Sequence, residues 1–173
     1  MFWRVFVIAA VCLHDASAKD PEKESQALME RFAPEDMWQL SSSLNEKDAQ
    51  VFATILKEDP FLEFKSAKEY VDKLRQKSTT LAEKMKKTAD AIHNKIMQLE
   101  PESQAFAKEL LEDNFKTSPN ETRAKQRKQM ILYFMDKYAA MSAKAKKAFG
   151  QKFPRLAASF SDPALRTAVT AIN

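Results

Sequence analysis

The stretch TTLAEKMKKTADAIHNKIMQL (79–99) carries an apolar stripe that decides the class of fold. From Leu81 to Leu99 its five steps cover 99 − 81 = 18 residues, or 3.6 residues a step, which is the period of a straight α-helix. A heptad repeat would place Lys95 on the stripe, so a coiled coil is not expected. The stripe could face a protein core, a partner helix, a membrane or a bound apolar molecule. Its members are Leu81, Met85, Thr88 or Ala89, Ile92, Ile96 and Leu99.

Composition extends the helical prediction to the whole chain. The 173 residues include one glycine, Gly150, whereas tight β-hairpins need glycine at positive φ. Residues that favour helices, such as Ala, Lys, Glu, Gln, Leu and Met, are abundant. No internal repeat, low-complexity tract or long linker divides the chain. We therefore predict an all-α protein, a single compact domain of about ten mostly short helices.

Prolines and capping residues predict where these helices begin. Proline is favoured in the first turn of a helix, and serine, asparagine or aspartate just before it. Gly150 is expected to end a helix, as glycine often does. The expected first helical residues include Pro34, Pro101, Pro119, Pro154 and Pro163, and the expected caps are Asn45, Ser66, Ser78, Ser118, Ser142 and Asp162. The expected helices span residues 21–31, 34–40, 46–58, 67–76, 79–99, 101–115, 119–139, 143–149, 154–160 and 163–171.

Residues 1–18, MFWRVFVIAAVCLHDASA, have the pattern of a secretory signal peptide. Arg4 precedes an apolar run, and small residues up to Ala18 form a cleavage site. Cleavage would leave residues 19–173 with a net charge of (28 − 1) − (24 − 1) = +4 and would remove the only cysteine, Cys12. The later chain has no run of ~18 apolar residues, the length that a membrane span needs. We therefore predict a secreted, extracellular protein that is held together by packing and not by disulfides.

The residues that most enzymes and metalloproteins depend on are scarce. After residue 18 there is one histidine, His93, and no cysteine, so no metal-ligand spacing occurs. A single glycine excludes Gly-rich phosphate loops and the Gly-x-Ser-x-Gly nucleophile turn. Carboxylates alternate with lysines at helical spacing, as on solvated helix faces. We expect neither an enzyme nor a metalloprotein.

Two surface motifs have alternative interpretations. The basic run RAKQRK (123–128) would suggest nucleic acid inside a cell, but after a signal peptide we expect no nucleic acid. It is either a solvated helix face or a surface that attracts anionic membranes. Asn120-Glu121-Thr122 is a sequon, which makes Asn120 a candidate glycosylation site in a secreted protein.

Several pieces in a fixed order resemble a known family. LRQKSTTLAEKMKKTADAIHNKIMQLEPESQAFAKELL (74–111) looks like the signature region of the nematode fatty acid- and retinol-binding proteins. Upstream, FAPEDMWQLSSSLNEKDAQVFATILKE (32–58) resembles the family's Pro-Glu helix and the capped helix after it. Downstream, MSAKAK (141–146) and FPRL (153–156) are similar to its later motifs. The resemblance covers about residues 30–165.

The resemblance implies a secreted helical carrier that holds fatty acids and retinol non-covalently in an internal apolar cavity. It implies no cofactor and no chemistry, and we expect a monomer. A ligand carboxylate would need a cation, and the candidates near apolar helix faces are Lys77, Lys84, Lys95 and Arg155. The residues expected to line the cavity are Phe52, Ile55, Leu56, Leu74, Leu81, Met85, Ile92, Ile96, Phe106, Leu110, Tyr133, Phe134, Phe153 and Phe160.

Two other interpretations remain open at the level of the sequence. A secreted helical interaction protein, such as a host-directed effector, would have the same apolar stripes but a filled, close-packed core and no lipid. An amphipathic membrane-active protein would need one continuous exposed apolar face, which the many caps and short turns disfavour.

Overall fold

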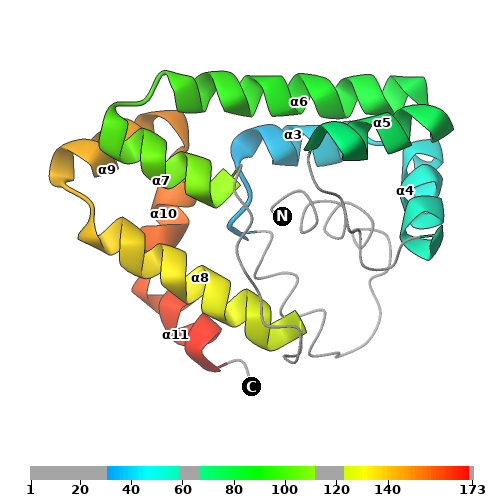
Figure 1. Cartoon of the computed structure of the whole chain (residues 1–173). Coiled ribbons are helices and arrows are strands. Elements are labelled where there is room, and N and C mark those ends of the chain that lie inside the picture. Colours follow the sequence, from blue (N-terminus) through cyan, green and yellow to red (C-terminus); the bar gives the residue numbers. More distant parts are fainter. Residues whose placement is uncertain (1–30, 59–66, 112–122, 172–173) are drawn as a thin grey trace.

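The computed structural model describes residues 31–58, 67–111 and 123–171, and in this part every regular element is a helix (Figure 1). The all-α prediction is therefore confirmed. The expected helix at 21–31 lies almost entirely outside the described residues. The helices are α3 (Glu35–Ser43), α4 (Glu46–Glu58), α5 (Ala67–Lys77), α6 (Thr79–Met97), α7 (Pro101–Leu111), α8 (Arg123–Ala140), α9 (Ala143–Lys152), α10 (Pro154–Ser161) and α11 (Pro163–Ala171).

The predicted caps begin the helices in the way the sequence indicates. The Ser78 hydroxyl accepts a hydrogen bond from the Leu81 N–H at 3.2 Å, and Ser142 accepts one from Ala145 in the same way. Asp162 accepts the N–H of Leu165 at 3.2 Å before α11. These bonds satisfy N–H groups that a helix leaves unpaired in its first turn. Ser66 and Ser118 lie outside the described residues.

Prolines mark helix starts with one small difference. Pro101, Pro154 and Pro163 are the first residues of α7, α10 and α11, as predicted. Pro34 stands one residue before α3, where its carbonyl accepts the N–H of Met37 at 3.0 Å. Proline suits both places because neither requires a backbone N–H. Pro119 lies outside the described residues.

The observed ends of α3 and α9 lie beyond the predicted ones, and α6 ends at Met97 instead of Leu99. α3 continues to Ser43, whose hydroxyl donates to the Leu40 carbonyl at 2.7 Å. α9 runs through Gly150 to Lys152, so Gly150 lies inside a helix and does not end it. The Phe153 N–H still reaches the Phe149 carbonyl at 2.8 Å, and the next residue, a proline, ends the ladder because it has no N–H.

The stripe on residues 79–99 faces the inside of the protein. Leu81 and Ile96 are fully buried, while Glu83 and Lys87 on the other face are exposed. In Figure 1, α6 is the longest helix drawn and passes over α3 with α5 alongside it. The stripe therefore packs against neighbouring helices, and burying its side chains gives about 1.5–3 kcal/mol each before entropy costs.

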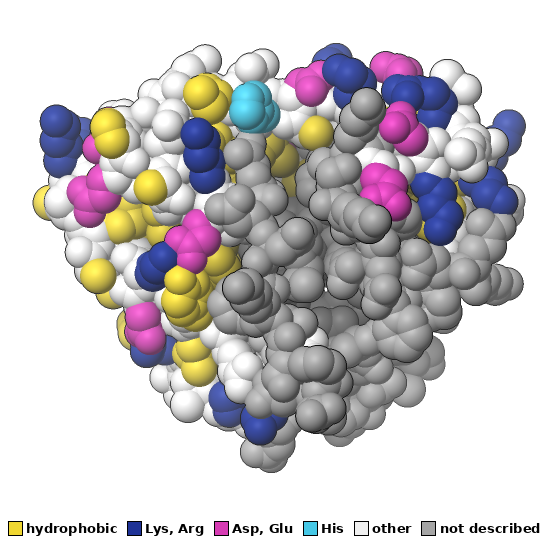
Figure 2. All heavy atoms as spheres, viewed as in Figure 1, with side chains coloured by type: hydrophobic (Ala, Val, Ile, Leu, Met, Phe, Trp, Pro, Cys, Tyr) yellow, Lys and Arg dark blue, Asp and Glu magenta, His cyan; other side chains and the backbone are white. Residues whose placement is uncertain are grey.

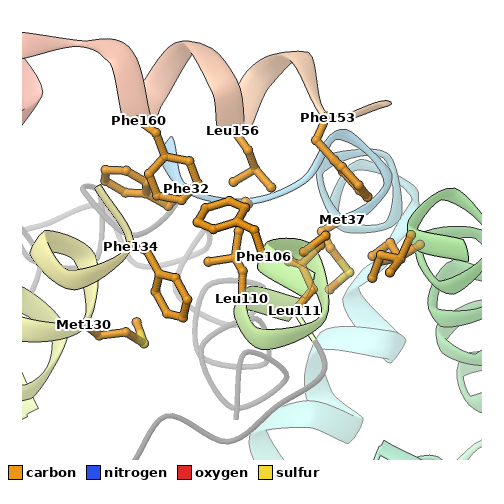
Figure 3. Packing of buried hydrophobic residues seen from close by; sticks show 14 of the residues in the cluster. Phe32, Met37, Phe106, Leu110, Leu111, Met130, Phe134, Phe153, Leu156 and Phe160 are labelled. Carbon is orange, nitrogen blue, oxygen red and sulfur yellow. The ribbon is translucent and has the colours of Figure 1, made fainter. Parts of the chain in front are cut away.

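The later helices form the other side of the fold. α9 packs on α7 and α10, and α8 packs on α10 and α11. Figure 3 shows apolar side chains from α3, α7, α8 and α10 pointing toward one another between these elements. Within residues 31–58, 67–111 and 123–171, no helix is both long and apolar enough to cross a membrane.

Candidate functional site

The residues predicted to line a cavity nearly all lie in the interior. Leu56 belongs to α4, but its side chain lies outside the described part. Tyr133 was predicted to line the cavity, but it is 37% exposed. Neighbouring positions on a helix point about 100° apart, and the structure turns Phe134 inward instead of Tyr133. The buried members are Phe52, Ile55, Leu74, Leu81, Met85, Ile92, Ile96, Phe106, Leu110, Phe134, Phe153 and Phe160.

Aromatic rings occupy the space between α7, α8, α9 and α10. Phe106 is at the centre, with its ring centroid 5.1 Å from that of Phe149 and 5.8 Å from that of Phe160. Phe134 and Tyr138 approach the same ring at 6.1 and 5.9 Å. Such edge-to-face and tilted contacts are those of close-packed aromatic groups. Protein side chains therefore fill this corner of the interior (Figure 3).

Apart from Leu110 on α7 and Phe153 between α9 and α10, the remaining predicted lining residues come from α4, α5 and α6. Phe52, Ile55, Leu74, Leu81 and Met85 are each at most 1% exposed, and α5 packs on both α4 and α6. Apart from Phe52 these side chains are aliphatic or thioether groups, without charge and without strong hydrogen-bonding capacity. The only thing that such a surface can offer a ligand is apolar contact.

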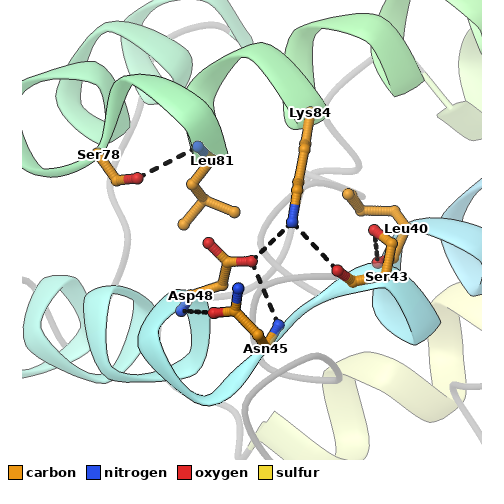
Figure 4. A network of polar contacts seen from close by, with 7 residues as sticks. All are labelled: Leu40, Ser43, Asn45, Asp48, Ser78, Leu81 and Lys84. Atoms are coloured by element: carbon orange, nitrogen blue, oxygen red, sulfur yellow. Dashed lines mark hydrogen bonds and ion pairs between the residues drawn. The ribbon is translucent and has the colours of Figure 1, made fainter.

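Lys84 does not face this apolar surface as a free cation. Its Nζ donates to the Asp48 carboxylate at 2.8 Å and to the Ser43 carbonyl at 3.1 Å (Figure 4). The Asp48 carboxylate also accepts the Asn45 N–H at 3.3 Å, while the Asn45 side chain accepts the Asp48 N–H at 2.9 Å. This reciprocal cap begins α4, and the Lys84–Asp48 ion pair joins α4 to α6. Lys84 therefore has a structural role.

Lys95 is held in a similar way. Its Nζ lies 2.8 and 2.7 Å from the two oxygens of Asp36, which ties α6 to the first turn of α3. The Asp36 side chain is 14% exposed, so the pair is only partly reached by water. A carboxylate ligand would have to displace Asp36 to bind Lys95. Lys77, another predicted candidate, is exposed at the end of α5 and takes part in an interaction of its own.

Arg155 differs from the three lysines. It lies in the first turn of α10, and its guanidinium carbon is 4.2 Å from the centroid of the Trp38 ring on α3. Its Nε is buried and has no hydrogen-bond partner. Among the described residues no carboxylate forms an ion pair with it. Of the four predicted head-group cations, Arg155 alone combines a buried donor with the absence of such a pair.

Glu109, Tyr133 and Lys137 form a polar cluster that joins α7 to α8. The Tyr133 hydroxyl donates to Glu109 at 2.5 Å, and Lys137 donates to the other carboxylate oxygen. Burial would raise the pKa of Glu109, but the hydrogen bonds from Lys137 and Tyr133 outweigh it, so this pKa is lowered. The same carboxylate raises the pKa of Lys137 above its usual value. The cluster explains why Tyr133 stays at the surface.

Charges of both signs are interspersed on the face shown in Figure 2. In the basic run 123–128, the Lys128 Nζ donates to the Thr170 carbonyl at 2.6 Å and so caps the end of α11. Contact of this run with anionic membranes stays a prediction. His93 is exposed, and the described residues contain no group of His, Cys, Asp and Glu that could hold a metal ion. The predicted cleavage residue, Ala18, and the sequon at Asn120 lie outside the described part.

Sequence reasoning missed three partners of these cations. Asp48 could have been found, because an acidic residue three positions after Asn45 fits a capping box. Asp36 had only a general signal, as acidic residues favour the first turn of a helix. Trp38 had no such signal, because no local sequence pattern connects it with Arg155.

Comparisons with known proteins agree with the helical fold. A family model described as "Nematode fatty acid retinoid binding protein (Gp-FAR-1)" matches residues 29–171. The solved structure of "Fatty Acid and Retinol binding protein Na-FAR-1 from Necator americanus" is similar with a TM-score of 0.60, at 24% identity, over 83% of this chain and 94% of that chain. No curated protein matches. The structural similarity supports a shared helical fold, and the match over most of the chain shows that this protein belongs to the nematode fatty acid retinoid binding protein family.

Proposed function

We propose that this protein is a secreted carrier that binds fatty acids and retinol non-covalently in an internal apolar cavity and performs no chemistry on them. The observation that carries the proposal is the family match over residues 29–171. The buried apolar faces of α4, α5 and α6 support it, because they would present an almost wholly apolar surface to a ligand. Fatty acids and retinoids are the ligands after which the family is named.

The ligand's hydrocarbon chain is placed among α4, α5 and α6 in this proposal. The α7–α10 corner offers less room, because the rings around Phe106 already pack against one another. Burying about 15 methylene groups at about 0.8 kcal/mol each gives roughly 12 kcal/mol. Association and ordering of the chain remove several kcal/mol of this. A dissociation constant in the sub-micromolar range is therefore expected.

Titration with an environment-sensitive fluorescent fatty acid tests the proposal. Delipidated protein should give a saturable, blue-shifted signal, because the probe enters a site from which water is excluded. Oleate should displace the probe, and retinol should compete if the sites overlap. If folded, lipid-free protein gives no signal, the carrier proposal fails and the alternative gains support, namely a helical interaction protein with a filled core.

Two methionines on α6 provide a matched pair for locating the chain. Met85 is buried at 1% exposure and faces α4 and α5 in the proposal, whereas Met97 is 50% exposed. Met85→Phe should weaken binding of the probe, because the larger ring occupies space that the ligand needs. Met97→Phe should leave binding unchanged. Equal affinities in both variants would place the ligand away from Met85, and circular dichroism verifies that each variant is folded.

Secretion is a separate part of the proposal, and it rests on residues 1–18. Expression of the full chain in secreting eukaryotic cells should release a protein that begins at Lys19, after cleavage behind Ala18. Mass spectrometry of the protein in the medium measures this and also reports a glycan on Asn120, if one is attached. Retention of the first 18 residues, or absence from the medium, would contradict secretion.

A further inference from the structure

We infer that Arg155, stacked on Trp38, binds the carboxylate of a fatty acid and so distinguishes fatty acids from uncharged ligands. The inference rests on the proposed function and adds a specificity-determining residue to it. The two residues come from α10 and α3, and the guanidinium carbon lies 4.2 Å from the centre of the indole ring. The buried Nε of Arg155 has no hydrogen-bond partner. A buried donor in this state is costly, and a carboxylate is an acceptor that would remove the cost.

Two of the other three candidate cations, Lys84 and Lys95, already have carboxylate partners. Lys84 lies 2.8 Å from Asp48, and Lys95 lies 2.7 Å from Asp36. A ligand carboxylate at either lysine would leave an aspartate unpaired, which is unfavourable for a group that is partly or wholly buried. At Arg155 no carboxylate of the described residues has to be displaced.

The contact with the face of the indole ring leaves the N–H donors of Arg155 available to a ligand. A guanidinium that lies over an aromatic ring presents one face to that ring, while its N–H groups point outward in its own plane. The edge with Nε and one terminal nitrogen can then donate two parallel hydrogen bonds to a carboxylate. No side chain caps α10, so the partial positive charge at the start of this helix favours an anion at the same place.

The base of Arg155 is set in the apolar interior. Phe153, two residues earlier, is 1% exposed, and the following Leu156 is fully buried. The hydrocarbon chain of a fatty acid whose carboxylate met Arg155 would therefore begin beside buried apolar side chains. Its carboxylate would have to open the contacts around Nε, since this atom is closed to water in the structure.

Trp38 gives a direct signal for this opening. The chain has two tryptophans, and the other is Trp3, within the predicted signal peptide. Binding of a carboxylate beside the stacked pair should change the emission of Trp38. Oleate should therefore alter the tryptophan fluorescence of the secreted protein, in which Trp38 is the one tryptophan left after cleavage behind Ala18.

The test compares three ligands and four proteins. Oleate carries a carboxylate, methyl oleate has the same chain without the charge, and retinol carries only a hydroxyl. Dissociation constants are measured by probe displacement for the wild type, Arg155→Gln, Arg155→Lys and Arg166→Gln. Arg166 is a matched control, because it is an exposed arginine paired with Asp136 at the surface.

The expected result is a loss that is confined to the charged ligand. Arg155→Gln should weaken oleate binding by roughly 10- to 100-fold, the range for hydrogen bonds to a charged group. Arg155→Lys should lie between this variant and the wild type, since it keeps the charge but loses the two-bond geometry. Methyl oleate and retinol should change by less than about threefold, and Arg166→Gln should resemble the wild type.

Other outcomes would overturn the inference. If Arg155→Gln weakens oleate and methyl oleate equally, Arg155 acts only through packing against Trp38. If wild-type protein binds methyl oleate as tightly as oleate, no cation recognises the head group, and this comparison holds even if the variants fail to fold. Both results leave the carrier function standing. If wild-type protein binds neither ligand, the carrier proposal fails and the inference fails with it.

Discussion

Replacement of Phe106 by alanine should lower the free energy of unfolding by about 3–5 kcal/mol. Phe106 is 5% exposed, and its ring is in contact with four others, those of Phe134, Tyr138, Phe149 and Phe160. Its removal takes away buried apolar area and leaves a void that these large neighbours cannot close without leaving their own contacts. Urea denaturation followed by circular dichroism measures the loss.

Phe106→Leu is the matched control for this prediction. Leucine fills much of the same volume but makes no ring contacts, so the loss should be clearly smaller than with alanine. A change of less than about 1 kcal/mol for Phe106→Ala would contradict the close packing described for the α7–α10 corner. It would also remove the reason for placing the ligand chain among α4, α5 and α6.

Replacement of Lys84 by methionine should cost about 2–4 kcal/mol of stability. The side chain of Asp48 is 7% exposed, and without Lys84 its charge would remain with only the Asn45 N–H as a partner. The Lys84 side chain is 31% exposed, so water screens part of the interaction and keeps the expected loss below that of a fully buried pair. For a chain of this size the thermal midpoint should fall by about 5–15 °C.

A double variant separates the pair from simple packing. Asp48→Asn removes the charge but keeps an oxygen that can accept the Asn45 N–H, so Lys84→Met with Asp48→Asn should recover much of the loss. Lys86→Met is the surface control, because Lys86 and Asp90 are both more than half exposed, and this variant should melt close to the wild type. Equal melting of Lys84→Met and Lys86→Met would show that the Lys84–Asp48 pair does not hold α4 to α6.

The helices could be predicted from local chemistry to within a few residues. Ser78, Ser142 and Asp162 cap the helices they precede, and the spacing of apolar residues on 79–99 gave the buried face of α6. Gly150 was misjudged because a glycine near the end of an apolar pattern is ambiguous. It either ends a helix or allows close approach, and here a Cβ on Gly150 would lie 3.5 Å from that of Ala157 on α10.

The candidate site could be predicted only in part. Its apolar members follow from periodicity, since a buried stripe must face inward on whichever element carries it. Both Tyr133 and Phe134 were predicted to lie inside, and periodicity could not show that the Tyr133 hydroxyl meets Glu109 of another helix at the surface. Periodicity also could not predict the partners of the cations. Lysines on α6 look alike in the sequence, but Lys84 and Lys95 meet aspartates 36 and 59 residues away.

The sequence by itself determined the class of fold, the helix starts, the inward faces and the resemblance to a lipid-binding family. These properties depend on residues within about four positions of one another, where helix geometry fixes which side chains are in contact. Tertiary structure alone decided which cations are paired with aspartates and which corner of the interior the aromatic rings fill. It also placed Arg155 of α10 on Trp38 of α3. These contacts join distant elements, and their partners are set by how the helices pack and not by the local pattern of either one.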